Sequence, residues 1–311
     1  MKIDSHLHVY PELKSFFIEN ESHGNTTSKF KKIFRKIIIP YNTTLHLLQE
    51  KSRLLPEKYI PYSDRLIALF GTVPTLVDST ESSLLYQMDK NNLDAAVVIA
   101  HPPFISNEFV LKLSKKHKSI IPIVNIEKNE LDPAEVLERY IVSSGARGLK
   151  IHPAADGFKS DDEHYHKLLK IADQYKLPVI IHTGCIHIKP FYKDPELGHV
   201  HHYESWFEMY PNCKFILAHM NYHYPSEAIS LLKKYENVYA DTSWQPIEVI
   251  KEAIDTLGSD KLMFGSDWPL VGENITYCLS HVEKLLERNQ ITSEQYENLM
   301  GLTAKKIFIG D

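Results

Sequence analysis

The 311-residue sequence has few cysteines, no long apolar run and no excess of positive charge. Cys185, Cys213 and Cys278 are widely spaced and form no C-x-x-C pair, which argues against a disulfide framework and for a reducing compartment. No stretch approaches the roughly 18 apolar residues that a membrane-spanning helix needs. Because the strand predicted at residues 2–9 leaves no room for a signal peptide, we expect a cytoplasmic protein.

Charge and motif content exclude further classes of function. The formal net charge of −5 gives no general basic field, which argues against nucleic acid and membranes as partners and favours a small-molecule substrate. The sequence also lacks a G-x-G-x-x-G or Walker phosphate loop, a low-complexity tract and any repeat beyond a β-α period.

From residue 79 onward, apolar segments of strand length alternate with segments of helical period, which is typical of β-α units and a parallel sheet. We expect clear helices at 160–176, with Ser160 as N-cap, and at 224–236, with Pro225 near the first turn. The pattern predicts an α/β protein of the (β/α)₈ TIM-barrel class rather than an open doubly wound sheet. The expected strands are 2–9, 93–102, 119–127, 146–153, 177–184, 213–221, 237–244 and 261–269.

The segment 10–78 is far longer than an ordinary strand-to-helix connection. We expect it to form a cap insertion within a single domain, 1–311. Its stretch 28–40, "SKFKKIFRKIIIP", mixes basic and apolar residues, which favours a helix packed over the barrel mouth; a membrane- or partner-binding helix is the alternative. The apolar side chains of the segment could equally serve a homo-oligomer.

His6 and His8 lie two residues apart on the first predicted strand, so both point to the same face. Neutral imidazole is a common ligand of zinc and related metals, and two of them on one strand make a partial site. An isolated pair is more often simply hydrogen-bonded or exposed, so a metal site requires partners elsewhere in the chain.

Other strands supply such partners at their carboxyl ends, where the active sites of this barrel class lie. "PVIIH", "KFILAH" and "LMFGSD" are apolar strands that each end in one residue of ligating type. A lone histidine there would usually be a core residue, but eight tilted strands bring their ends round one pocket. The pattern predicts a metal site among His6, His8, Lys150, His152, His182, His219 and Asp267.

The order H-x-H, "GLKIHP", "IIHTG", "LAHMN" and "FGSDWP" resembles the amidohydrolase superfamily, and specifically its amidohydrolase-2 branch, which is related to the aminocarboxymuconate semialdehyde decarboxylases. The resemblance runs through all eight strands to the last helix, "NLMGLTAKKIF", and leaves mainly residues 10–78 unmatched. In combination these motifs are specific to the superfamily, but they are not specific to a substrate.

The resemblance implies that His6, His8, His182 and Asp267 hold one divalent metal, zinc in the first place and manganese as the alternative. It also implies an open metal position for a water whose pKa the metal lowers. Asp267 would be catalytic, taking the proton of that water and delivering it to the leaving group. His219 is either a catalytic polariser or acid/base beside the water, or a ligand of a second metal.

Lys150 decides between one metal ion and two. Beside divalent cations a buried lysine must be neutral, carboxylated or turned away. "GLKIHPA" resembles the fourth strand of dihydroorotases, which implies a carboxylated Lys150 that bridges two metals. Alternatively, Lys150 or His152 binds a substrate carboxylate, or Lys150 pairs with an acid. His152 lies two residues after Lys150 on the same predicted strand, so both side chains point into the barrel, and His152 is the first candidate for substrate binding.

Several further residues are weaker candidates. Trp244 and Trp268 could wall the pocket or simply pack, and Asp4 could orient one of the first two histidines from one step deeper. Ser266 has no evident histidine and acid partners for a nucleophile. Loop histidines after the fifth strand could contact a substrate, although such residues are usually solvated; they are His187, His199, His201 and His202.

These residues favour a metal-dependent hydrolase that acts on an amide, lactone or ester bond of a small, carboxylated molecule. A non-oxidative decarboxylase that uses the same metal site is the alternative, and Lys150 counts against it because those relatives need no bridging lysine. A barrel kept for ligand binding or assembly is a third reading, which the intact ligand set disfavours. The sequence leaves the substrate open, since specificity in such barrels lies in the loops and the cap.

Overall fold

The computed structural model describes residues 1–11, 40–41, 43–52, 54–77, 79–187, 193–270 and 274–310, and for 72–77 it describes the backbone alone. Within these residues, eight strands form one sheet in chain order, and each strand pairs in parallel with the next. They are β1 (Ile3–Leu7), β2 (Ala95–Ile99), β3 (Ile120–Asn125), β4 (Gly148–Ile151), β5 (Pro178–His182), β6 (Lys214–Ala218), β7 (Val238–Asp241) and β8 (Leu262–Met263).

The sheet closes on itself between β8 and β1. The backbone N–H of Ser5 donates to the Phe264 carbonyl (2.8 Å), and the N–H of His8 donates to the Trp268 carbonyl (2.8 Å). Much of the segment predicted as a strand at 261–269 is therefore irregular backbone, but it still bonds to β1. The TIM barrel is confirmed, and an open doubly wound sheet is excluded because such a sheet leaves its edge strands unpaired.

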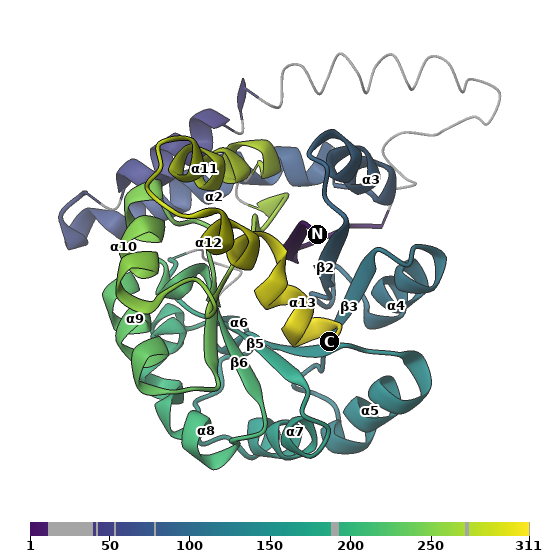
Figure 1. Ribbon diagram of the computed structural model, residues 1–311. Helices are drawn as coiled ribbons and strands as arrows, with labels where there is room; N and C mark the ends of the chain where they lie inside the picture. Colours follow the sequence, from purple (N-terminus) through teal and green to yellow (C-terminus); the bar gives the residue numbers. More distant parts are fainter. Residues whose placement is uncertain are drawn as a thin grey trace.

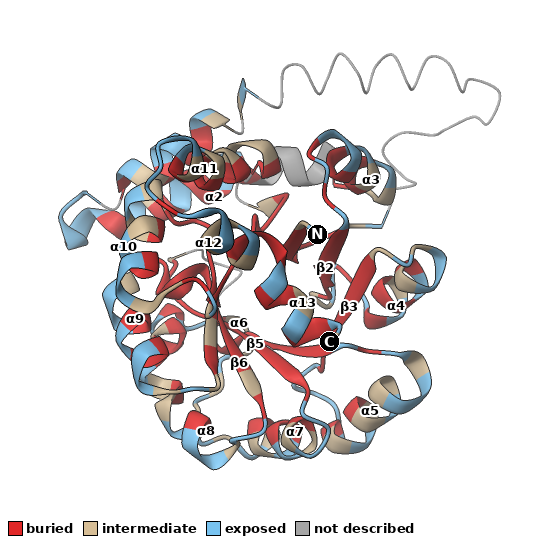
Figure 2. Cartoon of the chain, viewed as in Figure 1, coloured by how far each residue is buried: buried red, intermediate tan, exposed pale blue. Residues whose placement is uncertain are grey.

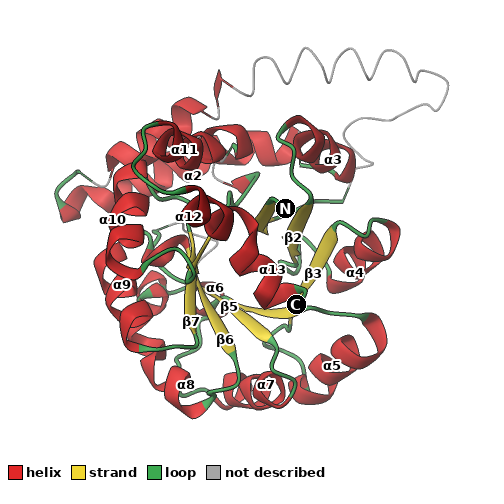
Figure 3. Ribbon diagram, in the orientation of Figure 1, coloured by secondary structure: helices red, strands yellow, loops and turns green. Residues whose placement is uncertain are grey.

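Helices surround this barrel (Figures 1 and 3). The two helices predicted most clearly are present as α7 and α9, with Pro225 in the first turn of α9. Ser160 is not the N-cap of α7: Asp162 is, and its carboxylate accepts a hydrogen bond from the His164 N–H (2.9 Å). The helices include α2 (Ile60–Val77), α3 (Glu81–Lys90), α4 (Asn107–Lys116), α5 (Pro133–Arg139), α6 (Pro153–Asp156), α7 (Glu163–Gln174), α8 (Glu204–Met209), α9 (Pro225–Lys234), α10 (Ile247–Leu257), α11 (Ile275–Glu287), α12 (Ser293–Glu297) and α13 (Thr303–Phe308).

The strands are buried on both faces, as parallel strands covered by helices require (Figure 2). Inside the barrel, apolar side chains of most strands pack together with Ile307 and Phe308 of α13, which crosses one end of the barrel (Figure 1). This packing fills the interior at the amino-terminal end of the strands. The polar side chains of the barrel interior therefore lie at the carboxyl end of the strands.

Part of the segment 10–78 covers that carboxyl end. Ala68 of α2 packs with Ile186, Tyr222 and Trp244, which follow β5, β6 and β7. The stretch 28–40 lies outside the described residues except for Pro40, and the interpretation of 10–78 as a cap insertion in a single domain stays a prediction. Among the described residues, no helix combines the length and apolar character needed to cross a membrane.

Candidate metal centre

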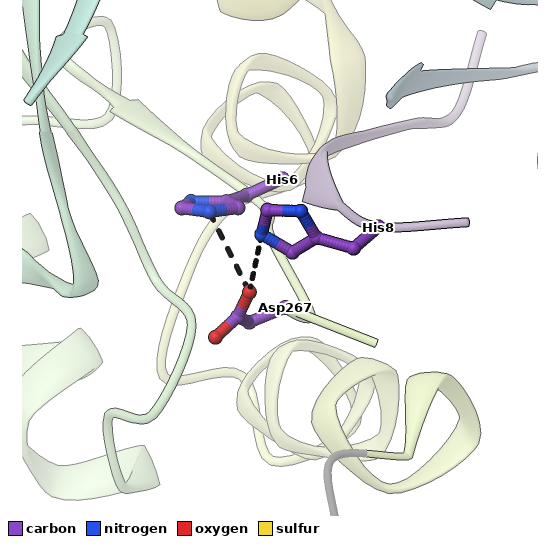
Figure 4. Close-up of side chains that lie close together, drawn as sticks. All are labelled: His6, His8 and Asp267. Atoms are coloured by element: carbon purple, nitrogen blue, oxygen red, sulfur yellow. Dashed lines mark ion pairs between the residues drawn. The ribbon is translucent and has the colours of Figure 1, made fainter. Parts of the chain in front are cut away.

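His6 and His8 lie at the carboxyl end of β1 with Asp267 beside them (Figure 4). The Asp267 N–H donates to the His6 carbonyl (2.7 Å), which holds the carboxylate next to the two rings. His6 Nε2 lies 3.5 Å from Asp267 Oδ1, and His8 Nε2 lies 3.3 Å from the same oxygen. All three side chains are almost completely buried, so solvent contributes little to their charge balance.

Hydrogen bonds on the far side of each ring fix its tautomer. His6 Nδ1 lies 2.8 Å from Asp241 Oδ2, and His8 Nδ1 lies 3.0 Å from the Ile99 carbonyl oxygen. Both partners are acceptors, so each Nδ1 carries the proton and each Nε2 presents a lone pair. Burial, together with the charge of Lys150, lowers the pKa of His6 well below its ordinary value and that of His8 to about 3, so both rings are neutral.

Three acceptor atoms therefore face one point with no donor between them. Asp267 Oδ1 is buried and accepts no hydrogen bond from the described residues. Burial raises the pKa of Asp267 well above its usual range, the positive charge of Lys150 lowers it, and a bound cation would lower it further and keep Oδ1 an acceptor. A zinc ion about 2.0–2.1 Å from its ligands sets tetrahedral ligands roughly 3.3–3.4 Å apart, close to the spacing of His6, His8 and Asp267. The donor set fits a divalent transition metal.

Asp241, at the end of β7, positions two of the histidines. Its Oδ2 bonds to the His6 ring, and its Oδ1 accepts hydrogen bonds from the backbone N–H groups of His219 (3.1 Å) and Ser243 (3.0 Å) and from the Ser243 hydroxyl. With both oxygens saturated by donors, Asp241 is suited to hold His6 in orientation rather than to bind a metal.

His219 is held by the same carboxylate through Ser243. Its Nδ1 lies 2.7 Å from Ser243 Oγ, whose proton goes to Asp241, so Nδ1 donates and Nε2 carries the lone pair. The ring stacks on His6 at 4.8 Å between centroids. His219 thus presents an unprotonated nitrogen next to His6.

Three residues at the strand ends adopt left-handed backbone conformations. The φ angles are 59° for His219, 64° for Trp244 and 55° for Asp267. Such values are uncommon for residues with a side chain and often mark functional sites. Trp244 uses its position to donate from Nε1 to Asp267 Oδ2 (2.8 Å), which leaves Oδ1 as the oxygen that faces the histidines.

The remaining strand-end histidines form an arc of rings round the mouth. His182 lies 5.0 Å from His219 and stacks on His152 at 3.9 Å between centroids. His101, which follows β2, joins this arc at 5.6 Å from His152 and 5.9 Å from His8. His182 therefore lies beside His219 but outside the cluster of three convergent acceptors, and its role as a fourth ligand stays a prediction.

Lys150 lies buried on β4 among these histidines. Burial lowers the pKa of Lys150 to about 8, while the carboxylates of Asp267 and Asp241 raise it. A fraction of the amine is then neutral near physiological pH, and the neutral amine is the form that becomes carboxylated. Both readings of Lys150, as a carboxylated ligand and as a partner for a substrate carboxylate, stay predictions.

One expectation about the surrounding residues is wrong. Asp4 contacts neither imidazole; its Oδ1 accepts the backbone N–H groups of His6 (3.2 Å) and Ser266 (3.1 Å). Asp4 is two residues deeper on the strand, roughly 7 Å below His6, which is beyond reach of the ring. Ser266 Oγ accepts the N–H of Trp268 (3.1 Å), a structural contact.

The loop histidines divide between two settings. The N–H of His187 donates to Asp64 of α2 (3.1 Å), so this residue ties a loop to α2. The ligating atoms of His199 and His201 come close to Glu227 at a more exposed position. None of the described contacts brings these histidines to the cluster of His6 and His8.

The model of a family described as amidohydrolase matches residues 3–309. No curated protein matches the chain. Among solved structures, a 5-carboxyvanillate decarboxylase from Novosphingobium aromaticivorans, complexed with manganese and 4-hydroxy-3-methoxy-5-nitrobenzoic acid, is 14% identical, with 99% of this chain and 96% of that chain covered and a TM-score of 0.62.

Two further structures are similar in fold. The 4-oxalomesaconate hydratase LigJ from Rhodopseudomonas palustris is 15% identical, with 99% of this chain and 95% of that chain covered and a TM-score of 0.62. An amidohydrolase from Burkholderia multivorans with bound zinc is 17% identical, with 76% of this chain and 91% of that chain covered and a TM-score of 0.60. At these identities the likeness shows the fold alone.

Proposed function

Because the chain belongs to the amidohydrolase family, we propose that it is a metal-dependent hydrolase acting on an amide, lactone or ester bond of a small, carboxylated molecule. The observation that supports this most is the convergence of three acceptor atoms, His6 Nε2, His8 Nε2 and Asp267 Oδ1, without a donor between them. We assign these atoms as ligands of a divalent ion, zinc before manganese, with His182 as the fourth ligand.

When bound, such an ion supplies a Lewis acid that lowers the pKa of water. The chain's own groups then manage the protons. Asp267, held by Trp244 at Oδ2, takes a proton from the attacking water and returns it to the leaving group. His219 presents an unprotonated Nε2, because Ser243 fixes its Nδ1 as the donor, and serves as a second proton acceptor.

Charge at the pocket suggests how the substrate is held. Lys150 is a buried cation surrounded by neutral histidines, and in its protonated form it pairs with a substrate carboxylate. His152 follows on the same strand and contributes a contact beside it. The competing arrangement is a carboxylated Lys150 that bridges a second ion, in which case His219 becomes a ligand.

The test is turnover of a panel of carboxylated lactones, cyclic amides and esters by protein that has been stripped with a chelator and reloaded with Zn²⁺ or Mn²⁺. We expect activity to vanish on stripping and to return with metal. Asp267→Asn, which keeps the shape of the side chain, should lose about 10²–10⁴-fold in kcat. Full activity of the metal-free protein would contradict the proposal.

Decarboxylation of a small carboxylic acid is the second candidate, because a decarboxylase is similar in fold, with 99% of this chain covered. The two reactions differ in the fate of water. Hydrolysis in H₂¹⁸O places one ¹⁸O atom in the product, whereas decarboxylation releases CO₂ and adds only a proton. Mass spectrometry of the product therefore separates them with the same protein and the same metal.

A further inference from the structure

A second cluster of ligating side chains lies between the helix of residues 43–52 and α11, and it shares no residue with the cluster of His6, His8 and Asp267. His46 Nε2 lies 3.3 Å from Glu50 Oε1, and His281 Nε2 lies 3.4 Å from the same oxygen. His46 and Glu50 are one helical turn apart and so share a face, while His281 comes from the facing helix. Two segments far apart in sequence thus contribute to one small volume.

Further polar contacts join the two helices. Thr43 and Asn274 bond across it (Nδ2 to Oγ1, 3.4 Å), and the Tyr277 hydroxyl approaches Glu50 Oε2 (3.5 Å). A buried helix–helix contact is ordinarily apolar, because ionisable groups lose their hydration there. The charge of Glu50 is therefore compensated within the protein, in part by His46 and His281, which lower the pKa of its carboxyl group against the effect of burial.

All three side chains of the cluster are largely buried, so solvent contributes little to stabilising their charges. His46 is 1% exposed, His281 is 5% exposed, and the Glu50 side chain is 12% exposed. Glu50 Oε1 is itself buried and, within the described part of the chain, accepts no hydrogen bond of regular geometry. Its distances to the two ring nitrogens are longer than the roughly 2.7–2.9 Å of a charge-assisted hydrogen bond.

The spacing instead matches that of a metal site. Ligands of a tetrahedral zinc ion lie roughly 3.3–3.4 Å apart, and the two distances from Glu50 Oε1 have these values. The same spacing recurs between Asp267 and its two histidines. We propose that His46, Glu50 and His281 bind a second divalent transition metal ion, Zn²⁺ by preference, which joins the 43–52 helix to α11. This site is independent of the proposed reaction.

Metal content per chain tests the proposal by difference, so the occupancy of the first centre need not be known. Protein from zinc-supplemented culture is desalted, and its zinc content per chain is measured by elemental mass spectrometry. We expect His281→Asn and Glu50→Gln each to lose about one zinc per chain relative to the wild type. The matched control is His117→Asn, because His117 also contacts a glutamate (Nε2 to Glu81 Oε1, 2.7 Å) but lacks the second histidine.

A second measurement covers the case in which one variant fails to fold. His6→Ala/His8→Ala removes the first centre, and Co²⁺ is titrated while its visible d–d absorption is recorded. We expect one tetrahedral Co²⁺ site to remain and to disappear when Glu50→Gln is added. The proposal is overturned if folded Glu50→Gln or His281→Asn keeps the wild-type zinc content, or if the folded double variant gives no Co²⁺ absorption.

Discussion

Replacing Asp241 by asparagine should weaken metal binding at His6 while leaving the barrel folded. The Oδ1 atom of Asp241 accepts three hydrogen bonds, from the His219 N–H, the Ser243 N–H and the Ser243 hydroxyl. In the variant only the amide oxygen can take that place, so the amide NH₂ must face His6 Nδ1. Nδ1 then becomes an acceptor and the ring proton moves to Nε2, the atom that would bind the ion.

The size of the effect follows from this change of tautomer. Loss of a carboxylate that orients a metal-bound histidine costs about 10- to 100-fold in metal affinity, which is about 1.4–2.7 kcal/mol. The assay is a competition titration of Zn²⁺ against a chromophoric chelator. Circular dichroism confirms that the protein is folded.

Asp4→Asn is the matched control. Asp4 is also a fully buried carboxylate, but it bonds to the backbone N–H groups of His6 and Ser266 and to the Ser266 side chain rather than to an imidazole, and an amide oxygen can accept the same bonds. We expect the zinc affinity of Asp4→Asn to stay within about threefold of the wild type. This is well below the change expected for Asp241→Asn, which alters the hydrogen-bond partner of the His6 ring. Wild-type affinity in folded Asp241→Asn would refute the tautomer argument.

Two further predictions concern Trp244 and Asp64. Trp244→Phe removes the indole donor from Asp267 and should lower the stability of the metal-free protein by about 1–3 kcal/mol, measured by urea denaturation. Burial raises the pKa of Asp64, but hydrogen bonds from His187 and His223 outweigh it and hold that pKa below its usual value of 3.8. The depressed pKa contributes stability that is present above about pH 4 and is lost as the pH falls further. Asp64→Asn should lower the free energy of unfolding by about 1–3 kcal/mol at pH 7. The difference in stability between wild type and variant should become smaller as the pH falls below 4, and an unchanged difference down to pH 3 would contradict this account.

The barrel and most of the centre could be predicted because parallel strands leave a simple pattern. A strand buried on both faces reads as a continuous apolar run, and the residue that ends it lies at the mouth. This pattern identified His6, His8, His182, His219 and Asp267, which the structure gathers at one end of the barrel.

Two further strand ends carry the same pattern, although no site residue was predicted there. "VVIAH" ends in His101 and "VYAD" ends in Asp241, and both lie at the centre. The role of Asp241 could not be read from sequence, because it depends on which ring lies across the barrel. The sequence placed Asp4 one step deeper than His6, but the expected contact with a ring was wrong, because its carboxylate accepts the backbone N–H groups of His6 and Ser266.

The second cluster had no sequence signal of comparable strength. His46 and Glu50 have the spacing of one helical turn, but so do many exposed pairs. Only the packing of the 43–52 helix against α11 brings His281 to them. Contacts between distant helices depend on tertiary packing, which neither spacing nor composition predicts.

The most direct test of the central claim is anomalous X-ray diffraction, at the zinc absorption edge, from crystals of the zinc-loaded protein. We expect an anomalous peak about 2.0–2.2 Å from His6 Nε2, His8 Nε2 and Asp267 Oδ1. A second peak beside Lys150 and His219 would establish the two-metal arrangement. No peak among His6, His8 and Asp267 in zinc-loaded, active protein would contradict the account.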